Sequence, residues 1–256
     1  MTAAGDAAVD WTRERWVKAG EWRVRWREAG DGPAIALIHG LGLSADFWWR
    51  NGPPLAAEGF RVLAPDLPGF GKTEGPSHLT VADQARAVAA WADAVGLGPA
   101  AYVGHSVSCQ AVLELAATEP SRVASLVLAA PTGDPGALRL LRQAAGFVAD
   151  PVFEPLGLIP TVGEHYFRAG VGRWLRTWIA SRTHDAVETA RKVAAPGIVI
   201  LGKHDPVVRR GFAEALAKAL PGGACVTLER GAHAVIFDAA EDFNAEVVRF
   251  LRGRPR

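Results

Sequence analysis

AYVGHSVSCQ, residues 101–110, is the stretch that decides the fold. The run AYV is apolar like a buried strand, residues 104–108 form a tight turn, and an apolar helical pattern begins at Val107. This arrangement presents Ser106 at the end of a strand and the start of a helix. A serine hydroxyl is a poor nucleophile at its own pKa. Ser106 can therefore react only if other segments supply a base, an acid that orients the base, and N–H donors for an oxyanion.

Other apolar runs predict the sheet to which this strand belongs. Continuously apolar segments are typical of strands buried on both faces of a parallel sheet, and they occur at 34–38, 61–64, 125–128, 197–201 and 225–228. Helical patterns alternate with them at 44–59, 81–95, 107–118, 212–220 and 241–251. Ahead of these, residues 13–18 and 22–27 alternate large apolar with charged side chains, which predicts an antiparallel edge hairpin. The alternation indicates an α/β fold with its site at the carboxyl ends of the strands.

One long segment breaks the alternation. Between Pro131 and Pro196 no strand pattern occurs, and helical pieces are expected at 137–148, 166–181 and 183–193. An insertion at the carboxyl end of the sheet would cover the site as a cap. We therefore divide the chain into a first part of the core domain (1–134), a helical cap (135–195) and a second part of the core domain (196–256).

Composition narrows the classes of partner. The chain has 256 residues, 49% of them hydrophobic, with a net charge of +1 and no polybasic run, so we expect a small-molecule substrate and no nucleic acid. Cys109 and Cys225 give neither a disulfide framework nor a metal-ligand spacing, and we expect no metal and no other cofactor. Residues 1–10 lack a signal-peptide pattern, and no apolar run reaches the about 20 residues of a membrane span. We expect a cytoplasmic protein, and leave monomer and homodimer open.

Five short motifs, each at the end of an expected strand, occur in a characteristic order. They are HGLG (39–42), DLPGFG (66–71), the Ser106 turn, GKHD (202–205) and GAH (231–233). With them, the sequence resembles the α/β-hydrolase fold superfamily in its capped, single-domain form, over about residues 13–252. The resemblance implies an eight-stranded, mostly parallel sheet flanked by helices, with a helical cap inserted after strand 6.

The resemblance also implies roles for individual residues. Ser106 would be the nucleophile, Asp205 the acid and His233 the base, in the chain order of this superfamily. Asp134, which follows strand 6, is the alternative acid. The turn departs from the pattern Gly-x-Ser-x-Gly at its last position, where Ser108 replaces glycine.

The oxyanion would be held by backbone N–H groups of Leu41 and Val107, which follow the His39-Gly40 turn and the nucleophile respectively. The stretch GFGKT (69–73) ends like a phosphate-binding loop, but that motif requires glycine where Asp66 stands. Nucleotide binding is therefore not expected.

The substrate pocket is predicted from aromatic and apolar side chains in the cap and near the motifs: Trp48, Phe147, Tyr166, Trp174, Trp178 and Val235. The alternative for each is plain packing of cap on core. The leading function is hydrolysis of a carboxylic ester of a small to medium, largely apolar substrate. The alternatives are a C–C bond hydrolase that acts on ring-cleavage products and a non-hydrolytic biosynthetic or ligand-binding member of the same fold.

Overall fold

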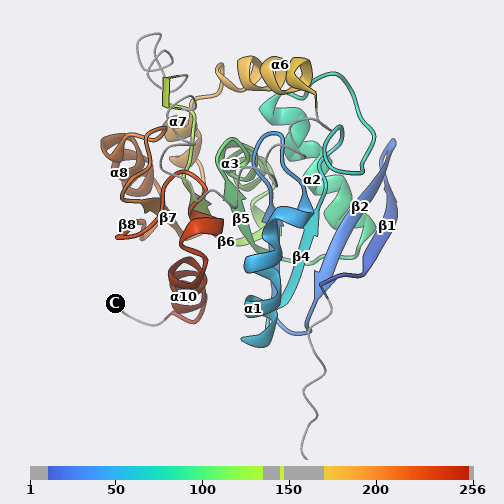
Figure 1. Ribbon diagram of the computed structural model, residues 1–256, viewed down its shortest axis with the longest axis horizontal. Coiled ribbons are helices and arrows are strands. Elements are labelled where there is room, and N and C mark those ends of the chain that lie inside the picture. Colours follow the sequence, from blue (N-terminus) through green and yellow to red (C-terminus); the bar gives the residue numbers. More distant parts are fainter. Residues whose placement is uncertain (1–10, 135–144, 147–169, 254–256) are drawn as a thin grey trace, which may run out of the picture.

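The computed structural model describes residues 11–134, 145–146 and 170–253. Within these residues eight strands form one sheet in the order β1-β2-β4-β3-β5-β6-β7-β8 (Figure 1). The strands are β1 (Glu14–Ala19), β2 (Trp22–Ala29), β3 (Ala34–Ile38), β4 (Arg61–Pro65), β5 (Ala100–His105), β6 (Val123–Ala129), β7 (Gly197–Gly202) and β8 (Ala224–Leu228). Strands β1 and β2 pair antiparallel with each other, and β2 pairs antiparallel with β4. The six strands from β4 to β8 pair in parallel, which confirms the predicted α/β sheet with an edge hairpin.

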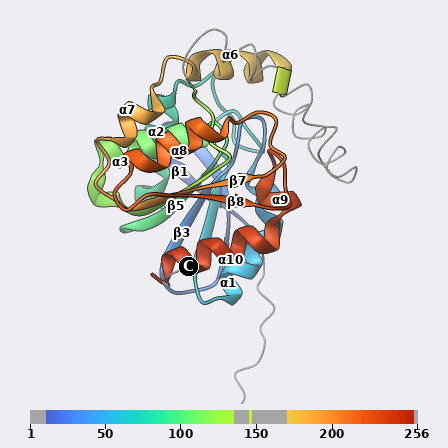
Figure 2. The same ribbon diagram turned by 90° about the vertical axis from the view of Figure 1, so that its left-hand side faces the viewer.

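Helices cover both faces of the sheet, so the apolar strands are buried from both sides (Figure 2). One face carries α2 (Val81–Ala94), α3 (Ser108–Thr118), α7 (Ala186–Ala190) and α8 (Arg210–Ala219). The other carries η1 (Ala45–Arg50), α1 (Gly52–Ala57), α9 (Val235–Asp238) and α10 (Ala240–Leu251). A short 3-10 turn, η2 (Pro120–Arg122), leads into β6. Each face buries its own hydrophobic cluster against the sheet.

The single helix expected over residues 44–59 is in fact two helices. The 3-10 helix η1 ends at Arg50, and α1 begins at Gly52 with Pro53 and Pro54 in its first turn. Proline fits the first turn of a helix but breaks a helix interior, because it has no N–H and its ring clashes with the preceding turn. One helix therefore ends just before Asn51 and a second begins just after it.

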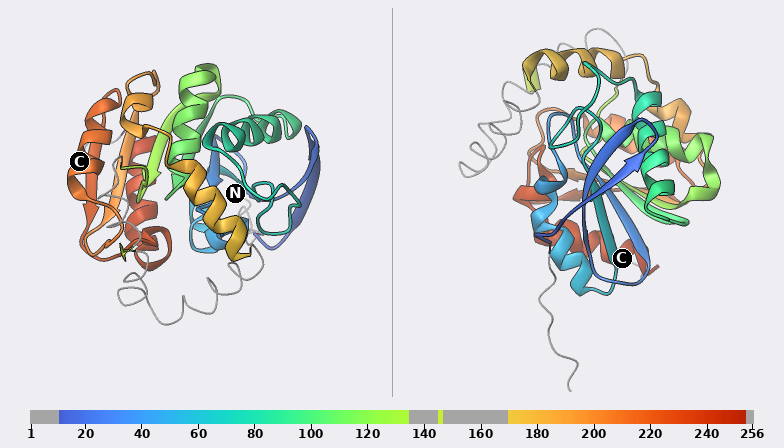
Figure 3. Two further views of the ribbon diagram at one scale, coloured as in Figure 1. Left: turned by 90° about the horizontal axis from the view of Figure 1, so that it is seen from above. Right: turned by 90° about the vertical axis from the view of Figure 1, so that its right-hand side faces the viewer.

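The helix α6 (Val171–Ser181) lies beyond the carboxyl ends of the parallel strands (Figures 1 and 3). Arg173 of this helix ties it to the loop after β4, because its guanidinium donates to the Gly69 carbonyl (2.7 Å) and the Pro76 carbonyl (2.9 Å). Of the helical pieces expected in the cap, 137–148 lies outside the described residues except for 145–146.

The helix α7 behaves differently from α6, although the division by sequence placed both in the cap. It packs against α3 and α8, and Ala186 and Ala190 are completely buried in the same core cluster as those helices. Small side chains at both positions let it pack closely, so α7 is part of the core layer. No described helix combines the length and the apolar character that a membrane crossing requires.

Candidate active site

The turn between β5 and α3 presents Ser106 in a strained conformation. Its φ is 56°, in the left-handed region that residues other than glycine rarely adopt. The Ser106 N–H donates to the Ala129 carbonyl (2.9 Å), and the Ser106 carbonyl accepts from the Cys109 N–H (3.1 Å). A Cβ atom at Gly104 would lie 2.9 Å from the Cys109 backbone, so the close approach of strand and helix requires glycine there.

Ser106, His233 and Asp205 lie at the ends of three different strands and meet in one hydrogen-bonded chain. The Ser106 Oγ lies 3.0 Å from His233 Nε2, and His233 Nδ1 lies 3.1 Å from Asp205 Oδ2. A carboxylate only accepts, so Nδ1 carries the proton and Nε2 is free to accept from the Ser106 hydroxyl. All three side chains are nearly buried, with the Asp205 carboxylate 2% exposed.

The Asp205 carboxylate is fixed independently of the histidine. Its Oδ1 accepts from the backbone N–H groups of Val207 (2.7 Å) and Val208 (2.9 Å), while its Oδ2 faces the imidazole. The alternative acid, Asp134, forms an ion pair with Arg209 instead. The structure thus brings Asp205, and not Asp134, against His233 Nδ1.

The neighbour of Ser106, His105, holds the loop that carries His233. Its Nε2 donates to the His233 carbonyl (3.0 Å), and its ring stacks on Phe47 at a centroid distance of 6.4 Å. A Cβ atom at Gly40 would lie 2.7 Å from His105 Nδ1. Complete burial, reinforced by the neighbouring His233, lowers the pKa of His105 to about 3.

This depressed pKa predicts that the protein loses stability in mild acid. Between the ordinary pKa of the unfolded chain, about 6.5, and the folded value, only the unfolded state binds the proton. Stability is therefore complete above about pH 6.5 and falls as the pH is lowered toward 3. We expect the free energy of unfolding to be about 2 kcal/mol smaller at pH 5 than at pH 8 because of His105 alone.

Urea denaturation at a series of pH values measures this effect. The variant His105→Gln removes the titrating group, so its stability should vary less between pH 8 and pH 5 than that of the wild type. If the free energy of unfolding changes equally with pH in the two proteins, His105 does not contribute to this effect.

The proposed oxyanion donors lie on the two segments that flank Ser106. Val107 precedes α3, and Leu41 follows the turn after β3. Among the described residues, neither the Leu41 N–H nor the Val107 N–H donates to a backbone carbonyl. The loop of Leu41 is braced by His39, whose Nε2 accepts from the Leu67 N–H (3.0 Å) and whose Nδ1 donates to the Gly40 carbonyl (2.8 Å).

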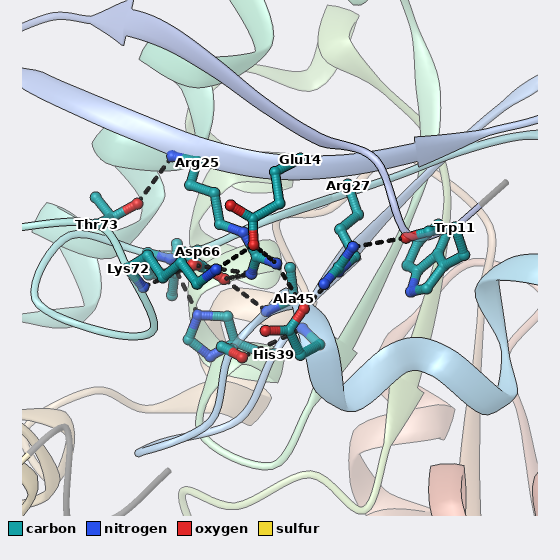
Figure 4. A network of polar contacts seen from close by, with 12 residues as sticks. Trp11, Glu14, Arg25, Arg27, His39, Ala45, Asp66, Lys72 and Thr73 are labelled. Carbon is teal, nitrogen blue, oxygen red and sulfur yellow. Dashed lines mark hydrogen bonds and ion pairs between the residues drawn. The ribbon is translucent and has the colours of Figure 1, made fainter.

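A buried polar network supports this loop from the side of the edge hairpin (Figure 4). Asp66 is completely buried and accepts from the Ala45 N–H (2.7 Å) and the Lys72 N–H (2.8 Å). Arg25 of β2 is also completely buried and contacts both oxygens of Asp66, at 3.2 and 3.3 Å. The same guanidinium pairs with Asp46 (2.6 Å) and Glu14 (3.3 Å). The network joins the edge hairpin, η1 and the loop after β4 behind the active site.

We expect Asp66→Ala to lower the free energy of unfolding by about 3 kcal/mol, because the Ala45 N–H, the Lys72 N–H and the buried Arg25 guanidinium lose the carboxylate that they contact. The matched control is Asp93→Ala, which breaks the ion pair of Asp93 with Arg122 on the surface, where the Asp93 side chain is 61% exposed. Such a pair contributes about 0 to 1 kcal/mol. Urea denaturation of both variants tests the prediction, and similar losses would contradict it.

The predicted pocket residues have different positions. Trp48 is completely buried in the core cluster with Trp11, and Val235 is completely buried at the start of α9. Trp174 and Trp178 stack on each other along α6, at a centroid distance of 5.9 Å. Phe147 and Tyr166 lie outside the described residues. Of the four that the structure describes, only the α6 pair therefore lies on the element that overlies the strand ends.

Two features of this site were not expected from the sequence. The Arg25 network was missed because Arg25 lies in an alternating strand, where a charged residue indicates a solvent-facing position. The hydrogen bond from His105 to His233 was missed because 128 residues separate His105 from His233 in the chain. Within the described part of the chain, no group of three or more His, Cys, Asp or Glu side chains is placed to hold a metal ion.

Comparison with protein families gives two matches. The family described as alpha/beta hydrolase fold matches residues 33–159, and the family described as TAP-like protein matches residues 173–254. These two matched segments contain all three residues of the Ser106, Asp205 and His233 chain.

Curated proteins include relatives of several kinds. The chain is 36% identical over 121 residues to a 2-hydroxy-6-oxo-6-phenylhexa-2,4-dienoate hydrolase of Burkholderia cepacia, a match that covers 44% of this chain and 41% of the relative. It is 30% identical over 257 residues to the dihydrolipoyllysine-residue acetyltransferase component of the acetoin cleaving system of Cupriavidus necator, covering 90% of this chain and 67% of the relative.

Among solved structures, the chain resembles a serine hydrolase involved in carbazole degradation. The two are 26% identical with a TM-score of 0.76, and the match covers 94% of this chain and 99% of the other.

Proposed function

This chain belongs to the α/β-hydrolase fold family, and from that premise we propose that it is a serine hydrolase that cleaves a carboxylic ester of a small to medium, largely apolar substrate. The observation that carries the proposal is the hydrogen-bonded chain from the Ser106 Oγ through the His233 imidazole to the Asp205 carboxylate. In this arrangement the hydroxyl has a base within reach, and the base has a partner for the charge that it gains.

In the proposed reaction, His233 Nε2 takes the proton of Ser106 as the Oγ attacks the ester carbonyl carbon. The charge on the imidazolium is stabilised by the Asp205 carboxylate at Nδ1. The carbonyl oxygen becomes an oxyanion held by the N–H groups of Leu41 and Val107. When the tetrahedral intermediate collapses, the alcohol leaves with the proton from His233 and Ser106 carries the acyl group.

The second half of the reaction repeats the first with water as the nucleophile. His233 removes a proton from water, the resulting hydroxide attacks the acyl-enzyme, and the released Ser106 Oγ takes the proton back. The products are the carboxylic acid and the alcohol. The unprotonated Nε2 of His233 supports both proton transfers, because it can accept a proton in one step and donate that proton in the next.

Hydrolysis of a carbon–carbon bond is the second candidate. It is supported by the dienoate hydrolase among the relatives, which is 36% identical over 121 residues. The same Ser106 chain could activate the attack on a ketone carbonyl, with a carbon atom as the leaving group. A third candidate transfers an acyl group without hydrolysis, and the acetyltransferase component among the relatives supports it.

The proposal is tested with two substrates and one covalent probe on the purified full chain. p-Nitrophenyl butyrate reports ester cleavage, and 2-hydroxy-6-oxo-6-phenylhexa-2,4-dienoate reports carbon–carbon cleavage. A fluorophosphonate reports an activated Ser106 by a mass increase. We expect labelling and a higher kcat/KM for the ester. A higher kcat/KM for the dienoate would transfer the assignment to the second candidate, and labelling without hydrolysis of either compound would favour the third.

The organisation of the chain and its location are part of the same proposal. We propose that α6, with its stacked Trp174 and Trp178, belongs to a cap within residues 135–195 that contributes to the pocket, and that α7 belongs to the core. We also propose a cytoplasmic location, which agrees with the fact that neither Cys109 nor Cys225 forms a disulfide.

A further inference from the structure

Ser108 replaces the last glycine of the family's serine turn, and its hydroxyl has a specific partner. The side chain lies in the first turn of α3 and is 1% exposed. Its Oγ donates to the backbone carbonyl of His39. Glycine at this position would leave that carbonyl without this donor.

The partner, the His39 carbonyl, lies just beyond the end of the pairing between β3 and β5. The ladder between β3 and β5 ends with Ile38 opposite Gly104, one residue before His39. Beyond this point the backbone enters a turn, in which the Leu43 N–H donates to the Gly40 carbonyl (3.1 Å). The hydrogen bond from the Ser108 hydroxyl therefore fixes the backbone at His39, the first residue after the last pair of the two strands.

This hydrogen bond joins the two segments that carry the proposed oxyanion donors. Ser108 directly follows Val107, and His39 lies two residues before Leu41. One side chain thus connects the backbone that carries one N–H to the backbone that carries the other. Donors must lie about 2.7–3.1 Å from the oxyanion to stabilise it, so the spacing between them matters. A displacement of about 1 Å can cost about 100-fold in rate.

The other supports of the Leu41 loop come from the opposite side. His39 binds the Leu67 N–H, and Asp66 binds the Ala45 N–H, so both attach the loop to the segment after β4. Neither of these contacts reaches α3. Among the hydrogen bonds of the described residues, the one from Ser108 attaches the loop to the helix that begins beside the nucleophile.

We propose that Ser108 is a positioning residue that sets the spacing between the Leu41 and Val107 N–H donors. The inference rests on the proposed function, since it assumes that these N–H groups bind an oxyanion. Ser108 touches neither the reacting carbonyl nor the proton that moves. It acts through the His39 carbonyl, and its effect belongs to the transition state because the donors strengthen their hydrogen bonds as negative charge develops.

The test compares Ser108→Ala with the wild type and with a matched control, Thr189→Val. Ser108→Ala keeps the Cβ atom and removes only the hydroxyl. Thr189→Val also removes a buried hydroxyl, one that hydrogen-bonds His184 Nε2 at 3.1 Å in α7, away from the triad. Four quantities are measured: kcat and KM for p-nitrophenyl butyrate, the affinity for a trifluoromethyl ketone that forms a tetrahedral adduct, and the affinity for butyrate.

We expect Ser108→Ala to lower kcat by about 10- to 100-fold, below the about 10²- to 10³-fold that complete loss of one donor costs. The affinity for the trifluoromethyl ketone should fall by a similar factor, while KM and the affinity for butyrate stay close to wild type. Thr189→Val should change none of the four. If Ser108→Ala does not fold, Ser108→Gly, which restores the family's residue, replaces it with the same expectations.

Two results would overturn the inference while leaving the proposed function intact. One is a wild-type kcat and ketone affinity in Ser108→Ala. The other is an equal loss of ketone and butyrate affinity, which would indicate a general distortion of the site. If the wild type itself neither reacts with the fluorophosphonate nor cleaves any ester, the proposed function fails and the inference falls with it.

Discussion

Ser106→Ala is expected to lower kcat for ester hydrolysis by about 10⁶-fold, the loss typical of removing the nucleophile of a serine triad. The substitution removes the hydroxyl that lies 3.0 Å from His233 Nε2, so the remaining rate reflects the oxyanion donors and substrate binding. The fluorophosphonate should no longer add mass to the protein.

The substitution should leave the fold intact. Alanine keeps the Cβ atom, so the left-handed backbone at φ 56° carries no more strain than it does with serine. The substitution removes a hydroxyl that contacts His233 Nε2. Thermal unfolding by circular dichroism checks this point, and Ser121→Ala, at an exposed serine of η2, is the matched control for activity. Ester turnover by Ser106→Ala near the wild-type rate would disprove the proposed mechanism.

Asp205→Asn is expected to lower kcat by about 10⁴-fold, because the amide reverses the tautomer of His233. Asparagine can still accept from the Val207 and Val208 N–H groups through its Oδ1, as Asp205 does now. Its NH₂ group then faces His233 Nδ1 and donates to it. The imidazole proton must move to Nε2, which can no longer accept from Ser106.

Asp134→Asn is the comparison that makes this prediction specific. Asp134 pairs with Arg209, and His233 Nδ1 faces Asp205, so the variant should keep a kcat close to that of the wild type. Both variants are assayed with p-nitrophenyl butyrate across pH 6 to 9. A large loss in Asp134→Asn with a small loss in Asp205→Asn would move the orienting role to Asp134.

The fold could be predicted from the sequence because its signals are local. Each parallel strand is a continuous apolar run, and each motif follows a strand at once, so one residue range predicts both the element and the place of the site. The break at Asn51 was missed because the apolar pattern continues through it. Only Pro53 and Pro54 mark the restart of the helix, and they read equally well as interruptions of one helix.

The supports of the site were harder to predict because they join residues far apart in the chain. Arg25 and Asp66 are separated by 41 residues, and Ser108 and His39 by 69. No periodicity links such pairs. A charged residue in an alternating strand normally faces water, and only the arrangement of η1 and the loop after β4 buries Arg25. From the sequence, Ser108 is interpreted as a small replacement for glycine. Its hydrogen bond cannot be predicted, because it depends on where the turn after β3 lies in space.

The distribution of the triad over three strand ends has a consequence for the newly made chain. Ser106 is synthesised 127 residues before His233, and Asp205 also follows Ser106. At about 5–20 residues per second, the ribosome takes about 6 to 25 seconds to cover that distance. During this time the first part of the core can fold around β5 with its serine turn complete but with no base beside it. Under the proposed mechanism, the newly made chain therefore cannot activate Ser106 until β8 and the loop after it have been made.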